Sequence, residues 1–155
     1  LYETVGMGAL KYFMLKVDPK KRMLFDPQES IDFNGNTGPF IQYTYARIQS
    51  ILRKNNGDIK IDEDSNITDK ERALIISLLE FPKTIQEAAN SFSPALIANY
   101  AYEVVKDFNS YYQSTSILGA DSPSIISFRV ALSQQTAKVI KSSMSLLGIN
   151  VPQRM

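Results

Sequence analysis

The clearest hydrophobic pattern in the chain covers residues 39–54, where nothing after Pro39 interrupts a helix. Apolar side chains recur there with the spacing of one side of an α-helix; they are Ile41, Tyr45, Ile48 and Leu52. A second set has the same spacing and lies about 200° around the axis, at about 100° per residue; it consists of Tyr43, Arg47, Ser50 and Lys54. We expect a helix with one side in a core and an aromatic, basic side at the surface.

Polar residues placed as caps predict where several helices begin. A Ser, Thr or Asn side chain can accept a hydrogen bond from the first backbone N–H groups, and proline in the first turn removes an N–H that has no partner in the helix. A Glu three residues after the cap completes a capping box. The predicted starts are Asn36 or Thr37 with Pro39, Thr68 with Glu71, Ser93 with Pro94, and Ser122 with Pro123.

Helical spacing also predicts helices over residues 3–17, 68–79, 84–92, 94–115 and 123–147, with a helical turn over 27–33 and Gly148 as the last terminator. Three of them carry a predicted core stripe: Ile85, Ala88, Ala89 and Phe92; Ile97, Ala101, Val104, Phe108 and Tyr111; Ile125, Phe128, Leu132, Val139 and Leu146. Residues 23–25 fit either a strand or an extended connector. The predicted fold is all-α, a helical bundle.

Composition indicates a globular protein, because 44% of its 155 residues are hydrophobic and 21% are charged. The net charge of +1 gives no overall basic signature of a nucleic-acid binder. The charges are unevenly distributed, however: residues 57–71 hold six carboxylates, whereas residues 123–155 hold four basic side chains and no acidic one. A polyanion would therefore meet the helix over 39–54 and the C-terminal third.

Several kinds of site are excluded by what the chain lacks. It contains no histidine and no cysteine, so it has no Ser-His or Cys-His nucleophile pair and no metal site built on those residues. It also lacks the glycine-rich phosphate loop G-x-x-x-x-G-K-[ST]. The acidic cluster Asp62 to Asp64 lacks the spacing of a calcium loop and is interpreted as a solvated linker. A self-sufficient enzyme is not expected.

The outer set of the helix over 39–54 has two interpretations. It can be a solvated surface with one Tyr lying along it. It can also be a platform for RNA, since Arg and Lys bind phosphate oxygens and a Tyr ring stacks on a base. Helical spacing does not decide between them.

The sequence of this stretch, GNTGPFIQYTYARIQSILRK, resembles a segment of class I arginyl-tRNA synthetases. In that family the run reads approximately GNTGPYxQYAxxRIxSIxRK and joins the catalytic domain to a helical anticodon-binding domain. The sequence departs from it at Phe40, where Tyr is usual, and at Thr44, where Ala is usual. Both changes leave the pattern intact.

Two later stretches resemble the same family. PALIANYAYEVVKDFNSYYQST is similar to PxxLAxYLYDLAxxFxxFY, and the ending LLGINVPQRM is similar to LLGIxxPERM with Gln153 in place of Glu. Arg129 and Leu132 fit the pattern after which this type of anticodon-binding domain is described. The resemblance implies that Tyr112 is a stacking candidate, with half-buried packing as the alternative, and that Met155 lies against the anticodon loop.

The resemblance implies two parts: residues 1–33 as the tail of the catalytic half or a connecting segment, and residues 34–155 as the helical anticodon-binding domain. The full-length protein would be an arginine–tRNA ligase that charges tRNA(Arg) using ATP with Mg. This piece would lack the active site and bind no cofactor itself. We expect a cytoplasmic monomer that contacts neither membrane nor DNA. The expected RNA-binding residues are Tyr43, Arg47, Ser50, Lys54, Tyr112, Arg129, Arg154 and Met155. The alternative is a helical protein-interaction module without RNA binding.

Overall fold

The computed structural model describes residues 1–55, 57, 59 and 67–155, and over these residues it is helical without a strand. The helices are α1 (Tyr2–Leu15), α2 (Pro27–Ser30), α3 (Gly38–Lys54), α4 (Asp69–Leu79), α5 (Phe81–Ser91), α6 (Pro94–Ser114) and α7 (Pro123–Leu146). The all-α prediction is confirmed, and residues 23–25 form a connector. The predicted acidic cluster Asp62 to Asp64 lies outside the described residues.

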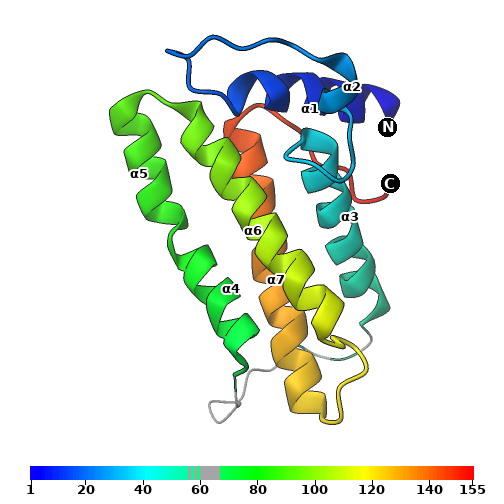
Figure 1. The fold of residues 1–155 in the computed structure, drawn as a ribbon. Helices are drawn as coiled ribbons and strands as arrows, with labels where there is room; N and C mark the ends of the chain where they lie inside the picture. Colours follow the sequence, from blue (N-terminus) through cyan, green and yellow to red (C-terminus); the bar gives the residue numbers. More distant parts are fainter. Residues whose placement is uncertain (56, 58, 60–66) are drawn as a thin grey trace.

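Three long helices form the centre of the molecule. α6 packs against α7, and α3 packs against both (Figure 1). α4 and α5 follow one another along α6, while α1 lies across one end of the bundle and packs on α3. The N- and C-termini both lie near this end. The C-terminal residues are thereby brought beside the start of α3.

The predicted core of α6 is confirmed, and so is that of α3 except at Leu52, which is only partly buried. On α3, Ile41 and Ile48 have no exposed surface and Tyr45 is also buried. All five residues of the predicted α6 stripe are buried, and Phe108 and Tyr111 are among the largest fully buried side chains. Burial of apolar area is the main stabilising term here, at about 25 cal/mol per Å². This packing fixes which side of α3 faces outward.

The predicted stripe of α7 is wrong at its C-terminal end, because Leu146 is 56% exposed. The buried line runs instead along Val130, Ile140 and Met144, among small hydroxyl side chains. Ser133 and Thr136 donate to carbonyl oxygens one turn earlier, at 2.8 and 2.9 Å, so their hydroxyls are satisfied within the helix. A buried face made of such residues does not look apolar in the sequence.

The four helix starts predicted from capping residues lie at the correct residues, but not all of them have a side-chain cap bond. Thr37 caps α3 by accepting from the Phe40 N–H at 3.3 Å, and the capping box of Thr68 and Glu71 is formed. Ser93 and Ser122 occupy the N-cap positions of α6 and α7 without a side-chain cap bond. Proline in the first turn of each helix still favours these starts.

The predicted helix over 84–92 begins earlier and ends differently. α5 starts at Phe81, with Pro82 in its first turn, and only Glu80 separates it from α4. Phe92, predicted on the apolar face, is 87% exposed and has φ of 52°. The Ser93 N–H donates to the Ala88 carbonyl at 3.0 Å, which closes a Schellman turn around Phe92. This turn directs the Phe92 side chain away from the core.

The helices α1 and α3 cross with almost no space between their backbones. A Cβ on Gly38 would lie 2.8 Å from the carbonyl carbon of Gly8, and a Cβ on Gly8 would overlap the Gln42 amide. The side chain of Tyr12 is fully buried beside this crossing, and its hydroxyl lies 2.9 Å from the Ala98 carbonyl oxygen. The two glycines of α1 differ: Gly6 has open space around it, whereas a side chain on Gly8 would force the Gln42 amide to move.

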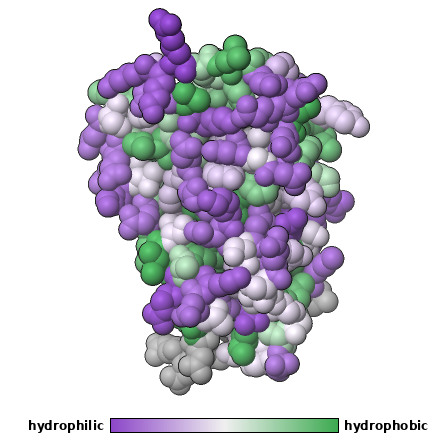
Figure 2. Space-filling view, in the orientation of Figure 1, coloured by the Kyte–Doolittle hydropathy of each residue, from purple (hydrophilic) through white to green (hydrophobic). Residues whose placement is uncertain are grey.

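The surface in Figure 2 is mostly hydrophilic, with hydrophobic side chains scattered over it. None of the described helices has the length and apolar content needed to cross a bilayer. In the described ranges there is also no group of three or more Asp or Glu residues arranged to hold a metal ion. Cationic and aromatic side chains gather on the part of the surface where α3, α6 and the C-terminal residues meet.

Candidate nucleic-acid interface

The predicted outer set of α3, hereafter the α3 row, is Tyr43, Arg47, Ser50 and Lys54. Tyr43 and Lys54 are exposed, and Arg47 and Ser50 are half-buried. The core stripe on the opposite side of α3 determines this orientation, because helix positions about 200° apart face opposite ways. The row lies at the edge of the contact between α3 and α6.

Arg47 lies between two aromatic rings. Its guanidinium carbon is 4.9 Å from the centre of the Tyr43 ring and 5.2 Å from that of Tyr112, which comes from α6. A guanidinium over an aromatic ring is attracted by the negative face of the ring, by about 0.5–1 kcal/mol at exposed sites. Tyr112 in turn stacks on Phe108, with ring centres 6.2 Å apart. The cation is therefore held on a platform that continues into the core.

A chain of hydrogen bonds on its buried side also holds the Arg47 guanidinium. Its Nη1 donates to Oδ1 of Asn109 at 2.5 Å. Asn109 is buried and donates through Nδ2 to the Thr44 hydroxyl at 3.0 Å, and that hydroxyl donates to the Phe40 carbonyl at 3.1 Å. Sequence reasoning missed Asn109. The available signal was a polar side chain one helical turn after Val105, on the buried side of α6.

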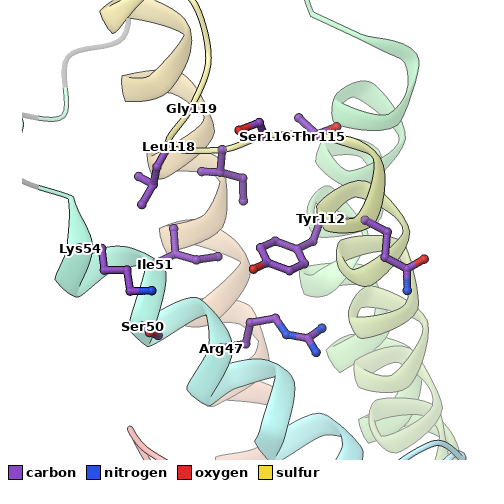
Figure 3. Close-up of a pocket in the computed structure, with 11 residues that line it drawn as sticks. Arg47, Ser50, Ile51, Lys54, Tyr112, Thr115, Ser116, Leu118 and Gly119 are labelled. Carbon is purple, nitrogen blue, oxygen red and sulfur yellow. The ribbon is translucent and has the colours of Figure 1, made fainter.

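Two hollows open on either side of Arg47 and Tyr112. The first hollow, of about 520 Å³, lies between α3 and the connection from α6 to α7, and Lys54 and Ser116 are among the residues lining it (Figure 3). The second hollow, of about 460 Å³, lies between α3 and the C-terminal tail, residues 148–155. Arg47, Ser50 and Tyr112 line both. They therefore form a shared wall.

The C-terminal tail closes the second hollow. Arg154 and Met155 line it together with Tyr43, and Met155 is 38% exposed. Arg53, on α3, donates from Nη1 to the Gln153 carbonyl at 3.1 Å and so holds the tail against the helix. The structure thus brings together seven of the eight predicted residues, all except Arg129.

The charge of the two hollows is of one sign. Their linings contain the cationic side chains of Arg47, Arg53, Lys54 and Arg154, and no Asp or Glu. Concave surfaces with charge of one sign raise the local concentration of counter-ions. Together with the exposed rings, this arrangement suits an unpaired nucleotide, whose base stacks on an aromatic ring while its phosphate meets a cation.

Comparison with known proteins identifies the family. The family model described as the DALR anticodon binding domain matches residues 41–155. The chain belongs to this family. The matched range of the DALR domain includes every residue of the two hollows.

Relatives of the DALR domain are considerably longer than this chain. It is 58% identical over 155 residues to an arginine–tRNA ligase of Flavobacterium psychrophilum, covering 100% of this chain and 26% of that protein. It is 52% identical over 156 residues to an arginine–tRNA ligase of Parabacteroides distasonis, covering 97% of this chain and 26% of that protein. The chain thus spans about a quarter of the length of these relatives.

The fold of the DALR domain also matches a solved structure. The arginyl-tRNA synthetase of Thermus thermophilus superimposes with a TM-score of 0.92 at 35% sequence identity. The similarity covers 98% of this chain and 27% of that one. It therefore includes α1 and α2, which precede the residues matched by the family model.

Arg129 is the predicted residue that lies elsewhere in the DALR domain. Its Nε donates to Glu71 Oε1 at 2.8 Å, and the Glu71 side chain is only 2% exposed. Its Nη1 donates to the Ser116 carbonyl at 2.8 Å. Ser116 lines the first hollow, whereas Arg129 does not line it and contacts it only through the Ser116 carbonyl. This ion pair was not predictable from local patterns, because its partners are 58 residues apart in the chain.

Proposed function

We propose that this chain is the tRNA-binding, anticodon-recognising part of an arginine–tRNA ligase. The observation that carries the proposal is the position of Arg47, held between two tyrosine rings and flanked by two hollows lined with cations and no carboxylate. The names of the long relatives supply the class of RNA. The proposed RNA-binding residues are the α3 row with Tyr112, Arg154 and Met155.

The full-length protein is proposed to join arginine to tRNA(Arg) with ATP and Mg. The residues of this chain do not fit an ATP site, because the sequence has neither a histidine nor a glycine-rich phosphate loop. We assign the chemistry to the part of the longer protein that this chain does not contain. The role of the bundle is to position the tRNA, so that binding energy at the anticodon helps to orient the distant acceptor end.

The division of the chain follows from the same proposal. Residues 1–33 would be the end of the catalytic half or its connection, and residues 34–155 the anticodon-binding domain. The family match beginning at residue 41 supports this division. We further propose a cytoplasmic monomer whose partner is tRNA(Arg), and which contacts neither DNA nor membrane.

The proposal is tested by measuring binding of the chain to a tRNA(Arg) transcript and to the same transcript with its anticodon bases replaced. We expect tighter binding of the unchanged tRNA. Four to six phosphate contacts, the number expected for such a surface, would lower affinity about 100-fold or more between 50 and 200 mM salt. Equal binding of both transcripts would refute anticodon recognition. Absence of tRNA binding at low salt would favour a protein-interaction module.

A further inference from the structure

The C-terminal tail contacts α1 in two ways: Lys11 of α1 donates from Nζ to the Gly148 carbonyl at 2.7 Å, and one side chain of α3 bridges α1 and the tail further along. Gln42 is fully buried, and its Nε2 donates to the Thr4 carbonyl of α1 at 3.1 Å and to the Asn150 carbonyl of the tail at 2.7 Å. Thr4 and Asn150 come from opposite ends of the sequence. A single amide group therefore joins α1, α3 and the tail.

The contacts of Gln42 use its nitrogen. Among the described residues, its Oε1 is buried without a hydrogen-bond partner, whereas both N–H groups point at carbonyl oxygens. An oxygen in place of Nε2 would be repelled by the Thr4 and Asn150 carbonyl oxygens, because all three atoms are acceptors. A Cβ on Gly8 would overlap this nitrogen, so the amide occupies space that is free because residue 8 has no side chain. The environment thus requires a donor with two N–H groups at this position.

The course of the tail shows what this amide holds. α7 ends in a Schellman turn, in which Gly148 has φ of 67° and the Ile149 N–H donates to the Met144 carbonyl at 2.9 Å. Ile149 is buried and anchors the turn. From residue 150 onward the tail is held by the bond from Gln42, by partial burial of Val151 and by the bond from Arg53 to Gln153. It then reaches the second hollow with Arg154 and Met155.

We propose that Gln42 is a positioning residue of the RNA surface: it holds the tail at Asn150 so that Arg154 and Met155 complete the second hollow beside Tyr43. This inference rests on the function proposed above. Gln42 itself faces away from the hollows and lines neither of them. Its effect on RNA binding therefore acts through the tail.

The test is a double-mutant cycle. Gln42→Met, which keeps the length of the side chain but removes both donors, is combined with deletion of residues 154–155, and affinity for a tRNA(Arg) transcript is measured at fixed salt. We expect each single change to weaken tRNA binding about 5- to 10-fold, the effect of one or two lost polar contacts. The double variant should bind tRNA with the same affinity as the deletion alone. Gln49→Met, on the same helix two turns later, is the control and should leave affinity unchanged.

A second measurement follows the tail without RNA. Hydrogen exchange of the backbone amides of residues 150–155 should be faster in Gln42→Met than in wild type, and unchanged in Gln49→Met. Gln42→Asn, which keeps an amide one methylene shorter, serves if Gln42→Met fails to fold by circular dichroism. If residues 150–155 exchange faster in Gln42→Met but the wild type binds no tRNA, the proposed function is refuted, whereas the role of Gln42 in holding the tail is supported.

Two results would overturn the inference. One is unchanged tail exchange in a folded Gln42 variant. The other is a further loss of affinity when Gln42→Met is added to the deletion, because Gln42 would then act on RNA binding independently of Arg154 and Met155.

Discussion

The guanidinium of Arg47 and the amide oxygen of Asn109 are 2.5 Å apart, across the contact between α3 and α6. Asn109 is fixed in turn by the Thr44 hydroxyl, so contacts within the protein set the direction of the Arg47 side chain. An arginine loses up to about 2 kcal/mol of rotamer freedom on being immobilised. Since much of that ordering is already present, the RNA binding proposed above would cost less side-chain entropy at Arg47.

Replacing Arg47 by Ala is expected to weaken tRNA(Arg) binding by about 1–3 kcal/mol, as for a charged side chain with a specific partner. Arg47→Lys should recover only part of the loss, because a lysine keeps the charge but not the planar guanidinium. Filter binding at fixed salt measures both. Arg72→Ala, an exposed arginine of α4, is the control and should bind as wild type. Unchanged affinity in Arg47→Ala would remove this residue from the proposed surface.

Asn109→Asp should weaken binding for an electrostatic reason. The new carboxylate would accept the same bond from Arg47 and neutralise the charge that we assign to a phosphate. Affinity should fall, and the slope of log K against log salt should become shallower by about one. A salt titration of tRNA binding gives both quantities. An unchanged slope would show that Arg47 does not meet a phosphate.

Gly38→Ala is expected to lower the free energy of unfolding by about 1–3 kcal/mol, the usual cost of overpacking. The added Cβ would lie 2.8 Å from a backbone carbon of Gly8, which cannot rotate away. Gly6→Ala is the matched control, since open space surrounds that position within α1. It should raise the free energy of unfolding by about 0.5–1 kcal/mol. Urea unfolding measures the free energy of unfolding of both variants. Equal changes in the two variants would mean that α1 and α3 are further apart than described.

The ion pair of Glu71 and Arg129 predicts a pH dependence. Burial by itself raises the pKa of Glu71, but hydrogen bonds from Thr68 and the interaction with Arg129 outweigh it, so that the pKa lies below its ordinary value of 4.5. A lowered folded-state pKa contributes stability above pH 4.5, and this contribution is lost as the pH falls through the folded pKa. The difference in free energy of unfolding between wild type and Glu71→Gln should therefore be largest near neutral pH and narrow below pH 4.5. A constant difference across this range would contradict the assignment.

Phe92→Gly is expected to stabilise the protein by up to about 1 kcal/mol. A left-handed backbone costs a non-glycine residue about 1–2 kcal/mol, and the φ of 52° at Phe92 lies in this region. Its side chain is 87% exposed and offers little packing to lose. Ala89→Gly, within the same helix, should instead destabilise by about 0.5–1 kcal/mol. Thermal unfolding compares them, and a lower melting temperature for Phe92→Gly would disprove the strain.

Much of the fold was predictable because local signals and packing agree. The spacing on α3 and α6 placed Ile41, Ile48 and Phe108 in the core, and Thr37 and Thr68 marked helix starts that the structure confirms. On α7 the signals disagree. Its buried face is rich in Ser and Thr, which bond to their own helix and resemble surface residues in a sequence.

The candidate site was predictable only where it follows one helix. The α3 row shares a face by spacing, and the family resemblance brought in Tyr112 and the tail. Asn109, Arg53 and Gln42 were missed because their roles depend on partners 62, 100 and 108 residues away in the sequence. Arg129 was included on charge and pattern, whereas its partner Glu71 is set by how α4 packs on α7. Such pairings arise from tertiary structure and leave no local trace.

Glu71 accepts bonds at both of its carboxylate oxygens: Oε2 from the first residue of the capping box, Thr68, and Oε1 from Arg129, which also holds the Ser116 carbonyl. Fraying of the first turn of α4 would thus release the arginine and, with it, the connection between α6 and α7. Segments of a protein that share such a bond open together as one cooperative unit. The beginning of one outer helix and the rim of the first hollow should accordingly exchange their amide hydrogens at a common rate.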